Sequence, residues 1–366
     1  MAVKEKEAKD SAGRRVLFVP VSGPRGMGEY ARALALATAA SRRWPDMQIH
    51  FALSRAAPYA GNTPFPATLL PSSPTFHSAE VIELIRTFRP TLVVFDNAGR
   101  TAQLRAAAKS GARVIYVSSR PKQRRKGFRV RWMRMLDEHW IAYPEFIAGA
   151  LGAFERLKLR WMGRPAVSFL DAVLPPADSA VATAMMAKLG VTPGAYVLVV
   201  PGGGTAHPGA ENAPQIVAEA AKRIAARGIP TVLVGVSDSG VTPAIASGLL
   251  RSSPRIPMAQ LVELIRGAKL VISNGGDTLL QAIACTRPCI AVPIAGDQAH
   301  RIEQCERRGL AVGARLNAGS LDEAAIALLQ DEGRRAALVA RLVDAKVSNG
   351  MNLALSAIDR LSTPEK

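Results

Sequence analysis

The stretch LVISNGGDTLLQAIACTRPCIAVPIAGDQAHRIEQCERRG, Leu270 to Gly309, decides the fold class. It opens with an apolar run, Leu270–Ser273, that predicts a buried strand. Two glycines follow, and then helical spacing of apolar residues over Thr278–Ala284. A second apolar run, Cys289–Val292, precedes a second helical pattern, His300–Arg308. Strands that alternate with helices in this way predict a parallel sheet built from βα units.

The same alternation extends through the rest of the chain. The other predicted strands are Arg15–Val21, Gln48–Leu53, Thr91–Phe95, Val114–Val117, His139–Ala142, Tyr196–Val200 and Thr231–Val234. The other predicted helices are Tyr30–Ala40, Ala79–Phe88, Ala102–Ser110, Ala213–Ala226, Met258–Gly267, Leu321–Gln330, Gly333–Val347 and Asn352–Leu361. The fold class is therefore α/β, with two tandem Rossmann-like domains that face a cleft.

The domain boundaries follow from composition. Residues 1–13 are a polar tail that we expect to be disordered. We expect an N-terminal domain over 14–165, a proline-rich hinge over 166–180, a C-terminal domain over 181–349 and a closing helix over 350–366.

Composition and charge exclude several classes of protein. No window approaches the roughly 20 apolar residues of a membrane span, and the polar N-terminus is not a signal peptide. Three cysteines cannot form a disulfide framework, which favours a reducing cytoplasm. They form no common zinc pattern with His300, and we expect them to pack as small apolar side chains.

The positive charge is concentrated in the first half of the chain. The net charge is +18, and residues 1–180 hold 28 of the 47 Lys and Arg residues but only 14 of the 29 acids. From Arg100 to Arg134 there are twelve basic residues and no acid. An anionic partner is therefore expected for the first half, such as a phosphorylated substrate, a membrane surface or a nucleic acid.

Three glycine-rich turns each follow a predicted strand. They are Ser22–Glu29, Pro201–Thr205 and Ser273–Thr278. Free backbone N–H groups and helix N-termini at such turns bind anions. The first turn has neither the G-x-G-x-x-G spacing of a dinucleotide site nor the Gly-Lys-Ser/Thr of a P-loop. A nicotinamide or ATP enzyme is therefore disfavoured.

The quoted stretch resembles the donor-binding segment of glycosyltransferases with the two-domain architecture called GT-B. It is most similar to family 28, which includes the lipid-linked N-acetylglucosaminyltransferase of peptidoglycan synthesis. The matching positions are Gly275-Gly276, Thr278, Gln281, Arg287-Pro288, Val292-Pro293 and Asp297-Gln298. The first turn, GMGEYARALAL, resembles the GMGH-x-x-R-x-L-x-L opening of predicted polysaccharide-biosynthesis glycosyltransferases, and a related opening occurs in a nucleotide-sugar hydrolase. The likeness spans Arg15 to Leu361.

Two positions depart from the family pattern. Glu29 stands where the family usually has a histidine that is often the catalytic base. Gln281 stands where the family usually has a glutamate that binds the ribose hydroxyls. A glutamine amide can still bind a hydroxyl, although without charge assistance.

The resemblance implies an inverting, metal-independent transfer from a nucleotide-sugar donor, for which UDP is the expected carrier, and no cofactor. No Asp-x-Asp element stands at a strand end to chelate a metal. The expected donor-binding residues are Gly203, Gly204, Thr205, Asn274, Gly275, Gly276, Thr278, Gln281, Asp297 and Gln298. The glycine turns would bind the diphosphate, whereas Asp297 and Gln298 would hold sugar hydroxyls or, alternatively, cap the next helix.

Two acids are candidates for the catalytic base. Glu29 starts the first helix, where it could equally be an acid favoured by the helix dipole. Asp96 ends the strand LVVFD at the same sheet edge; it could act as a base, orient the acceptor, or cap the following helix.

The basic segment from Arg120 to Arg134 has three interpretations: a solvated face, a contact with an anionic membrane or lipid phosphate, or a nucleic-acid site. No nucleic-acid-binding module pattern appears, so nucleic acid is the least favoured partner. The predicted acceptor or membrane contacts are Arg25, Arg120, Arg124, Arg125, Phe128 and Trp132.

The function predicted first is transfer of a sugar to a lipid-linked or phosphorylated saccharide in cell-surface polysaccharide or lipopolysaccharide assembly. The protein would be cytoplasmic and peripheral on the inner face of the cytoplasmic membrane. Two alternatives stay open. One is a nucleotide-sugar hydrolase or epimerase on the same fold. The other is a basic nucleotide- or nucleic-acid-binding protein that has lost catalysis.

Overall fold

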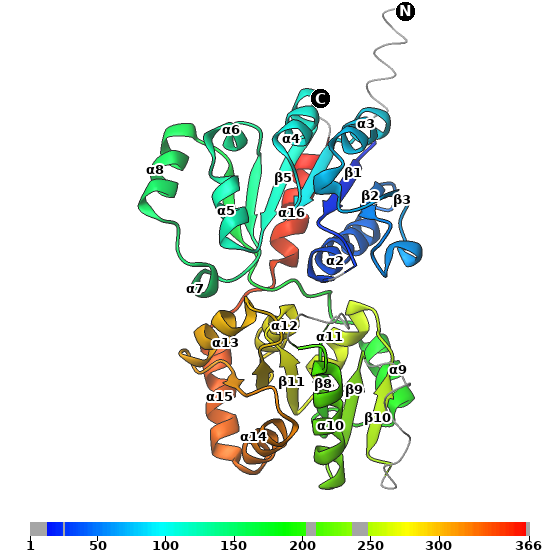
Figure 1. Cartoon of the computed structure of the whole chain (residues 1–366), viewed down its shortest axis with the longest axis vertical. Coiled ribbons are helices and arrows are strands. Elements are labelled where there is room, and N and C mark those ends of the chain that lie inside the picture. Colours follow the sequence, from blue (N-terminus) through cyan, green and yellow to red (C-terminus); the bar gives the residue numbers. More distant parts are fainter. Residues whose placement is uncertain (1–12, 25, 203–209, 236–247, 364–366) are drawn as a thin grey trace, which may run out of the picture. The chain divides into compact units, whose positions relative to one another are not determined.

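The computed structural model describes residues 13–24, 26–202, 210–235 and 248–363. The chain divides into two compact units (Figure 1). Unit 1 contains residues 1–171 and 350–366, and unit 2 contains residues 172–349.

Unit 1 is built on a seven-stranded sheet in which every neighbouring pair is parallel. Its strands are β1 (Arg15–Pro20), β2 (Gln48–Ser54), β3 (Ala67–Leu70), β4 (Leu92–Asp96), β5 (Arg113–Ser118), β6 (Glu138–Ile141) and β7 (Ala166–Phe169). They lie in the order β3-β2-β1-β4-β5-β6-β7. This is the doubly wound Rossmann order, continued by one strand.

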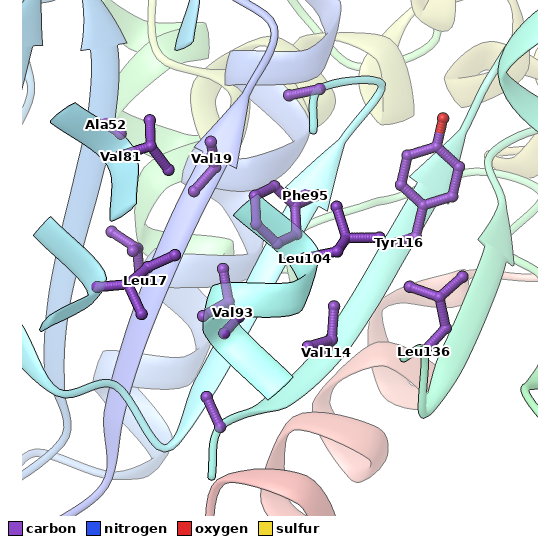
Figure 2. Packing of buried hydrophobic residues seen from close by; sticks show 14 of the residues in the cluster. Leu17, Val19, Ala52, Val81, Val93, Phe95, Leu104, Val114, Tyr116 and Leu136 are labelled. Carbon is purple, nitrogen blue, oxygen red and sulfur yellow. The ribbon is translucent and has the colours of Figure 1, made fainter. Parts of the chain in front are cut away.

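Helices cover the sheet of unit 1 (Figure 1). They are α2 (Gly28–Arg43), α3 (Ser78–Phe88), α4 (Thr101–Lys109), α5 (Pro121–Gly127), α6 (Val130–Met133), α7 (Glu145–Ala148), α8 (Ala153–Met162) and α16 (Gly350–Ser362), with short 3-10 turns η1 (Ala60–Asn62) and η2 (Pro74–Phe76). Figure 2 shows one side of the core, where Leu17, Val93 and Val114 from three adjacent strands pack with Leu104 of α4. The central strands are apolar in their interiors because both of their faces are covered.

The last helix, α16, belongs to unit 1 although it follows unit 2 in sequence. It packs on α2 and β4. Arg360 of α16 pairs with the buried Glu138 of β6, and Arg14 pairs with Asp359 at 2.7 Å. A Cβ at Gly350 would lie 2.2 Å from the carbonyl oxygen of Leu170, so only glycine fits where the chain returns to unit 1.

Unit 2 repeats the same order with six strands, β10-β9-β8-β11-β12-β13, again all parallel. They are β8 (Val197–Val200), β9 (Thr231–Val234), β10 (Leu250–Ser253), β11 (Leu270–Asn274), β12 (Cys289–Val292) and β13 (Val312–Gly313). Its helices are α9 (Ser179–Leu189), α10 (Ala213–Ala226), α11 (Met258–Gly267), α12 (Asp277–Ala284), α13 (Gln298–Glu306), α14 (Ala318–Gln330) and α15 (Glu332–Asp344).

The predicted α/β class with two Rossmann-like domains is confirmed. Each predicted strand is present, with ends shifted by at most one residue. The sequence patterns missed β3, β7, β10 and β13, which are the edge strands of the two sheets. The division between the units falls at Asp171 and Ala172, inside the segment 166–180 that was expected to be a hinge, although β7 occupies the first four residues of that segment.

Candidate functional site

Each sheet has a point where the strand order reverses, between β1 and β4 in unit 1 and between β8 and β11 in unit 2. Loops that leave the carboxyl ends of these strands run to opposite faces of the sheet, and the crevice between them is the usual ligand site of such folds. The first glycine turn follows β1, the second follows β8 and the third follows β11. All three predicted turns therefore lie at reversal points.

In unit 1 this edge contains an ion pair between Asp96, at the end of β4, and Arg32 of α2. The Arg32 Nε and Nη2 atoms donate to the two Asp96 carboxylate oxygens at 2.8 and 2.9 Å. Asp96 is 2% exposed, and α4 begins at Thr101 with Arg100 at its N-cap. Asp96 is therefore not the cap of α4, and its pair with Arg32 fixes α2 against the sheet. A role as a rival base or in orienting the acceptor stays a prediction.

Glu29 lies beside this pair in the first turn of α2, where it is partly exposed. Asn97 Nδ2 donates to Glu29 Oε1 at 2.9 Å and also to Ser119 Oγ, and Ser119 N donates to Asn97 Oδ1 at 2.9 Å. Asn97 has φ +52°, a left-handed conformation that asparagine tolerates better than most residues. The three residues form a hydrogen-bonded cluster at the ends of β4 and β5 that holds the Glu29 carboxylate in one orientation.

Tyr59 is a neighbour of this cluster that the sequence patterns did not indicate. Its ring stacks on Tyr30 of α2 with centroids 3.9 Å apart. Burial, and then the nearby Glu29 charge, raise the pKa of the Tyr59 phenol, so the group stays protonated. Its hydroxyl is buried and has no hydrogen-bond partner among the described residues. It is therefore a donor available beside the candidate base.

In unit 2, Gly202 of the second glycine turn lies against Asn274 and Gly276 of the third at the point where the strand order reverses. Asn274 ends β11, and its Oδ1 accepts from the backbone N–H of Gly276 at 3.1 Å. A Cβ at Gly202, which has φ +116°, would lie 2.3 Å from Asn274 Nδ2. A Cβ at Gly276 would lie 2.8 Å from Asn274 Oδ1. The second and third glycine turns therefore meet through the Asn274 side chain. A Cβ at either glycine would displace that side chain, and the positive φ of Gly202 also favours glycine.

Helix α12 begins directly after this contact, with Gly276 at its N-cap and no side chain capping it. Its first-turn N–H groups, which include that of Thr278, lack partners within the helix and can bind an anion. Gln281 lies one turn further along and is 4% exposed. Its contact with a ribose stays a prediction.

Asp297 and Gln298 start α13 and differ from each other in exposure. The side chain of Asp297 is 48% exposed and accepts from Arg301 Nη2 at 3.0 Å. Gln298 is buried, and its Oε1 accepts from the N–H of Ile294 at 2.9 Å. Asp297 is accessible to a ligand. Gln298 Oε1 holds its own loop in place, and the contact of Gln298 with a sugar stays a prediction.

Arg301, which the sequence patterns missed, is a buried cation of this site. It donates to the carbonyl of Gly275 as well as to Asp297. The Asp-x-x-x-Arg spacing at the start of a helix could have indicated this ion pair, because residues four apart lie on the same face of a helix. Four other predicted residues, Arg25, Gly203, Gly204 and Thr205, lie outside the described residues.

The basic segment of unit 1 corrects a second prediction. Phe128 and Trp132 are each 3% exposed and pack in the core, and Trp132 Nε1 donates to Thr101 Oγ1 at 3.0 Å. Arg124 binds Glu155 and three carbonyl oxygens of the segment 148–150. Phe128 and Trp132 are therefore core residues that do not reach a membrane surface, and Arg124 is taken up by contacts within unit 1. The amphipathic spacing of the segment turns its aromatic side chains inward and leaves other arginines outside. Arg120 and Arg125 are exposed.

His139 of β6 lies beneath this segment and is fully buried. Its Nε2 is 2.8 Å from Ser118 Oγ, and its ring is 5.0 Å from that of Phe128. A Cβ on Gly127 would lie 2.3 Å from its Cε1. Burial, and then the charge of Arg124, lower the pKa of His139 from 6.5 to about 3.

This burial predicts a loss of stability in mild acid. The unfolded chain takes up a proton at His139 below about pH 6.5, but the folded chain does not until about pH 3. Stability is therefore full above pH 6.5 and falls as the pH falls, by about 2 kcal/mol between pH 7 and pH 5. All four tryptophans are in unit 1, so urea titrations followed by tryptophan fluorescence measure this unit alone. In His139→Gln the free energy of unfolding should fall less between pH 7 and pH 5. An equal fall in the two proteins would refute the prediction.

The three cysteines are thiols, and two of them are fully buried. Burial raises the pKa of Cys285 to about 11 and those of Cys289 and Cys305 to about 12. Across the described residues, no group of three or more His, Cys, Asp or Glu side chains is arranged to hold a metal ion. Nor does that part of the chain contain a helix that is long and apolar enough to cross a membrane.

The chain matches no known protein family model and no curated protein. It is similar in structure to several solved proteins over nearly its whole length. The spinosyn forosaminyltransferase SpnP shares 16% identity at a TM-score of 0.60, covering 96% of this chain and 100% of that one. The glycosyltransferase SnogD from Streptomyces nogalater shares 18% at 0.61, with 95% and 99% covered. A ugt transferase from Siraitia grosvenorii in complex with UDP shares 14% at 0.57, with 95% and 100% covered.

These likenesses establish the fold. The chain has the two-domain α/β fold called GT-B, with a strand–Gly-Gly–helix turn at the reversal point of its second sheet. The more specific resemblance to family 28 stays a prediction.

Proposed function

We propose that the protein transfers a sugar from a UDP-linked donor to a lipid-linked or phosphorylated saccharide. The observation that carries the proposal is the interlocked turn of unit 2, where Asn274 holds Gly276 at the N-terminus of α12 against Gly202. Fold alone does not fix function, but this turn offers backbone N–H groups to a diphosphate at the place where α/β folds bind ligands. UDP is favoured because a structural neighbour is described in complex with it.

The acceptor class rests on charge. Residues 1–180 carry a surplus of 14 positive charges, whereas residues 181–366 hold 19 basic and 15 acidic residues. A phosphate-bearing acceptor on unit 1 would be attracted by this surplus. Assembly of cell-surface polysaccharide or lipopolysaccharide is the process we propose, since it uses such acceptors, and peripheral attachment to a membrane would bring the enzyme to them.

The chemistry proposed for Glu29 is that of a general base. The acceptor hydroxyl oxygen attacks the anomeric carbon of the sugar while the bond from that carbon to the diphosphate oxygen breaks. The hydroxyl proton passes to the Glu29 carboxylate, and the bonding electrons leave with UDP, whose charge the α12 N-terminus stabilises. Asn97 orients the carboxylate, and the Tyr59 hydroxyl, which has no hydrogen-bond partner among the described residues, is a further donor near Glu29.

The first test is calorimetric titration with UDP, GDP and CDP, with and without Mg²⁺. We expect micromolar binding of UDP in both conditions, and loss of binding in Gly276→Trp, whose side chain would occupy the space beside Asn274. If none of the three nucleotides binds, the glycosyltransferase proposal fails. Turnover of UDP-sugars without any acceptor would instead favour the hydrolase.

Substitution of the candidate base should affect turnover but not donor binding. Glu29→Gln keeps an oxygen for Asn97 to bind but cannot accept the proton, so kcat should fall by about 10²- to 10⁴-fold. The dissociation constant for UDP should stay unchanged. Asn97→Ala frees the carboxylate and also removes two hydrogen bonds to Ser119; it keeps the base itself, so it should lower kcat less and shift its pH profile. A Glu29→Gln enzyme with wild-type kcat would remove Glu29 from the mechanism.

A further inference from the structure

Helix α8 (AFERLKLRWM) exposes three large apolar side chains. Phe154 is 81% exposed, Leu157 62% and Trp161 71%. Their spacings of three and four residues place them within roughly 60° of one another around the helix, at about 100° per residue. No residue of α8 is fully buried. The helix therefore presents an apolar stripe, defined by these three residues, to its surroundings.

Polar contacts attach α8 to the rest of unit 1. Glu155 accepts from Arg124 of α5 at 2.6 Å and from the N–H of Gly152 at 2.9 Å. Lys158 Nζ donates to the carbonyl of Phe128 at 3.2 Å. Since these contacts anchor the helix, the apolar stripe is not needed to hold it in place, and its exposure requires another explanation.

Exposed cations lie on one side of the stripe: Arg160 is about 60° and Arg156 about 100° from Leu157 around the helix. Lys122 and Arg125 are exposed on α5, which the Arg124–Glu155 pair joins to α8. Over residues 120–164 there are twelve basic residues and four acids. Three of those acids, Asp137, Glu138 and Glu155, are already in ion pairs within unit 1. The surroundings of the stripe therefore carry a clear positive excess.

We propose that α8 docks unit 1 on an anionic lipid surface, with Phe154, Leu157 and Trp161 inserted at the headgroup boundary. An apolar face with aromatic residues, bordered by Arg and Lys, is the pattern of helices that lie in a membrane interface. A second copy of the chain suits the stripe less well. The three side chains expose roughly 400 Å², about half of what one partner contributes to a stable interface. A symmetric contact would also bring like charges together.

This inference rests on the proposed function only for the reason why docking would be useful: a lipid-linked acceptor would be found at such a surface. The docking itself depends on the residues of α8 and can be tested without any sugar transfer.

The experiment is co-sedimentation of the full chain with phosphatidylcholine vesicles, with and without phosphatidylglycerol. We expect binding to the anionic vesicles only. The triple variant Phe154→Ser, Leu157→Ser, Trp161→Ser should bind at least tenfold more weakly. Arg156→Gln with Arg160→Gln should weaken binding about 25-fold, since each cation near an anionic surface contributes about fivefold. Phe76→Ser is the matched control, because Phe76 is 72% exposed elsewhere on unit 1 and should not affect binding.

Tryptophan fluorescence gives an independent measurement. Trp132 and Trp140 are buried, so insertion of Trp161 should shift the emission of the protein to the blue when anionic vesicles are added. Trp161→Phe keeps the apolar stripe and should bind without most of that shift.

Three results would overturn the proposal: no binding to either vesicle, equal binding by the triple variant, or self-association of the wild type that the triple variant loses. The last would identify the stripe as an interface between copies. The triple variant should titrate with UDP as the wild type does. Failure of vesicle binding with intact UDP binding would therefore refute the docking alone and leave the glycosyltransferase proposal standing.

Discussion

Asp96→Ala should lower the free energy of unfolding of unit 1 by about 3–5 kcal/mol. The substitution leaves the Arg32 guanidinium buried without the carboxylate that now binds it through two hydrogen bonds, and an uncompensated buried charge is among the most costly defects in a protein. Urea titration followed by tryptophan fluorescence measures the effect, because all four tryptophans belong to unit 1.

Two further variants make this result specific. Replacing both partners, Asp96→Leu with Arg32→Met, should recover most of the loss, since paired buried charges can be exchanged for apolar side chains at little cost. Asp359→Ala removes the acid of an ion pair with Arg14, also in unit 1, whose carboxylate is 41% exposed, and it should cost about 1 kcal/mol or less. A loss of less than 1 kcal/mol in Asp96→Ala would show that the pair does not fix α2 to the sheet.

Gly202→Ala should weaken UDP binding by at least 100-fold. The new Cβ would lie 2.3 Å from Asn274 Nδ2, and φ +116° is a conformation that alanine rarely adopts. Asn274 must then move, and it releases the N–H of Gly276 that begins the proposed diphosphate site. Calorimetric titration with UDP measures the loss. The prediction depends on the proposed donor site, and unchanged affinity would place that site elsewhere.

Gly228→Ala separates backbone strain from the clash. Gly228 also has positive φ, at +83°, but a Cβ there would meet nothing within 4 Å, and the residue lies between α10 and β9. The variant should lose about 1 kcal/mol of stability and bind UDP as the wild type does. Equal losses of affinity in the two variants would mean that strain in unit 2, and not the position of Asn274, controls binding.

The predicted fold was accurate where residues are buried on both faces. Strands such as β4, LVVFD, which is apolar up to its final Asp96, and β8, VLVV, are apolar runs because helices cover both sides of the sheet. The missed strands are the sheet edges, such as β10, LRSS, and the two-residue β13. Edge strands pair on one side only and are less buried, so their residues need no apolar pattern and leave little signal in a sequence.

The candidate sites could be predicted only in part. The Gly-Gly turn before α12 could be predicted because two glycines between an apolar run and a helical pattern indicate a tight turn from strand to helix. The Glu29–Asn97–Ser119 cluster was not, since its hydrogen bonds join residues 68 and 22 positions apart in the chain. Phe128 and Trp132 were expected outside because they lie among arginines, yet the packing of α5 and α6 on β5 and β6 turns them into the core.

The sequence by itself determined the class of fold, the two sheets and the turns where a phosphate would bind, because apolar periodicity and glycine placement act over a few residues. Tertiary structure alone decided which charged residues are available. It placed Asp96 against Arg32, joined Arg124 to Glu155, and left Phe154, Leu157 and Trp161 facing outward. In the sequence, a carboxylate or an apolar side chain looks the same whether it is buried and paired or exposed to solvent. Only the neighbours that the fold brings to it determine whether it is a structural partner, a base or a contact surface.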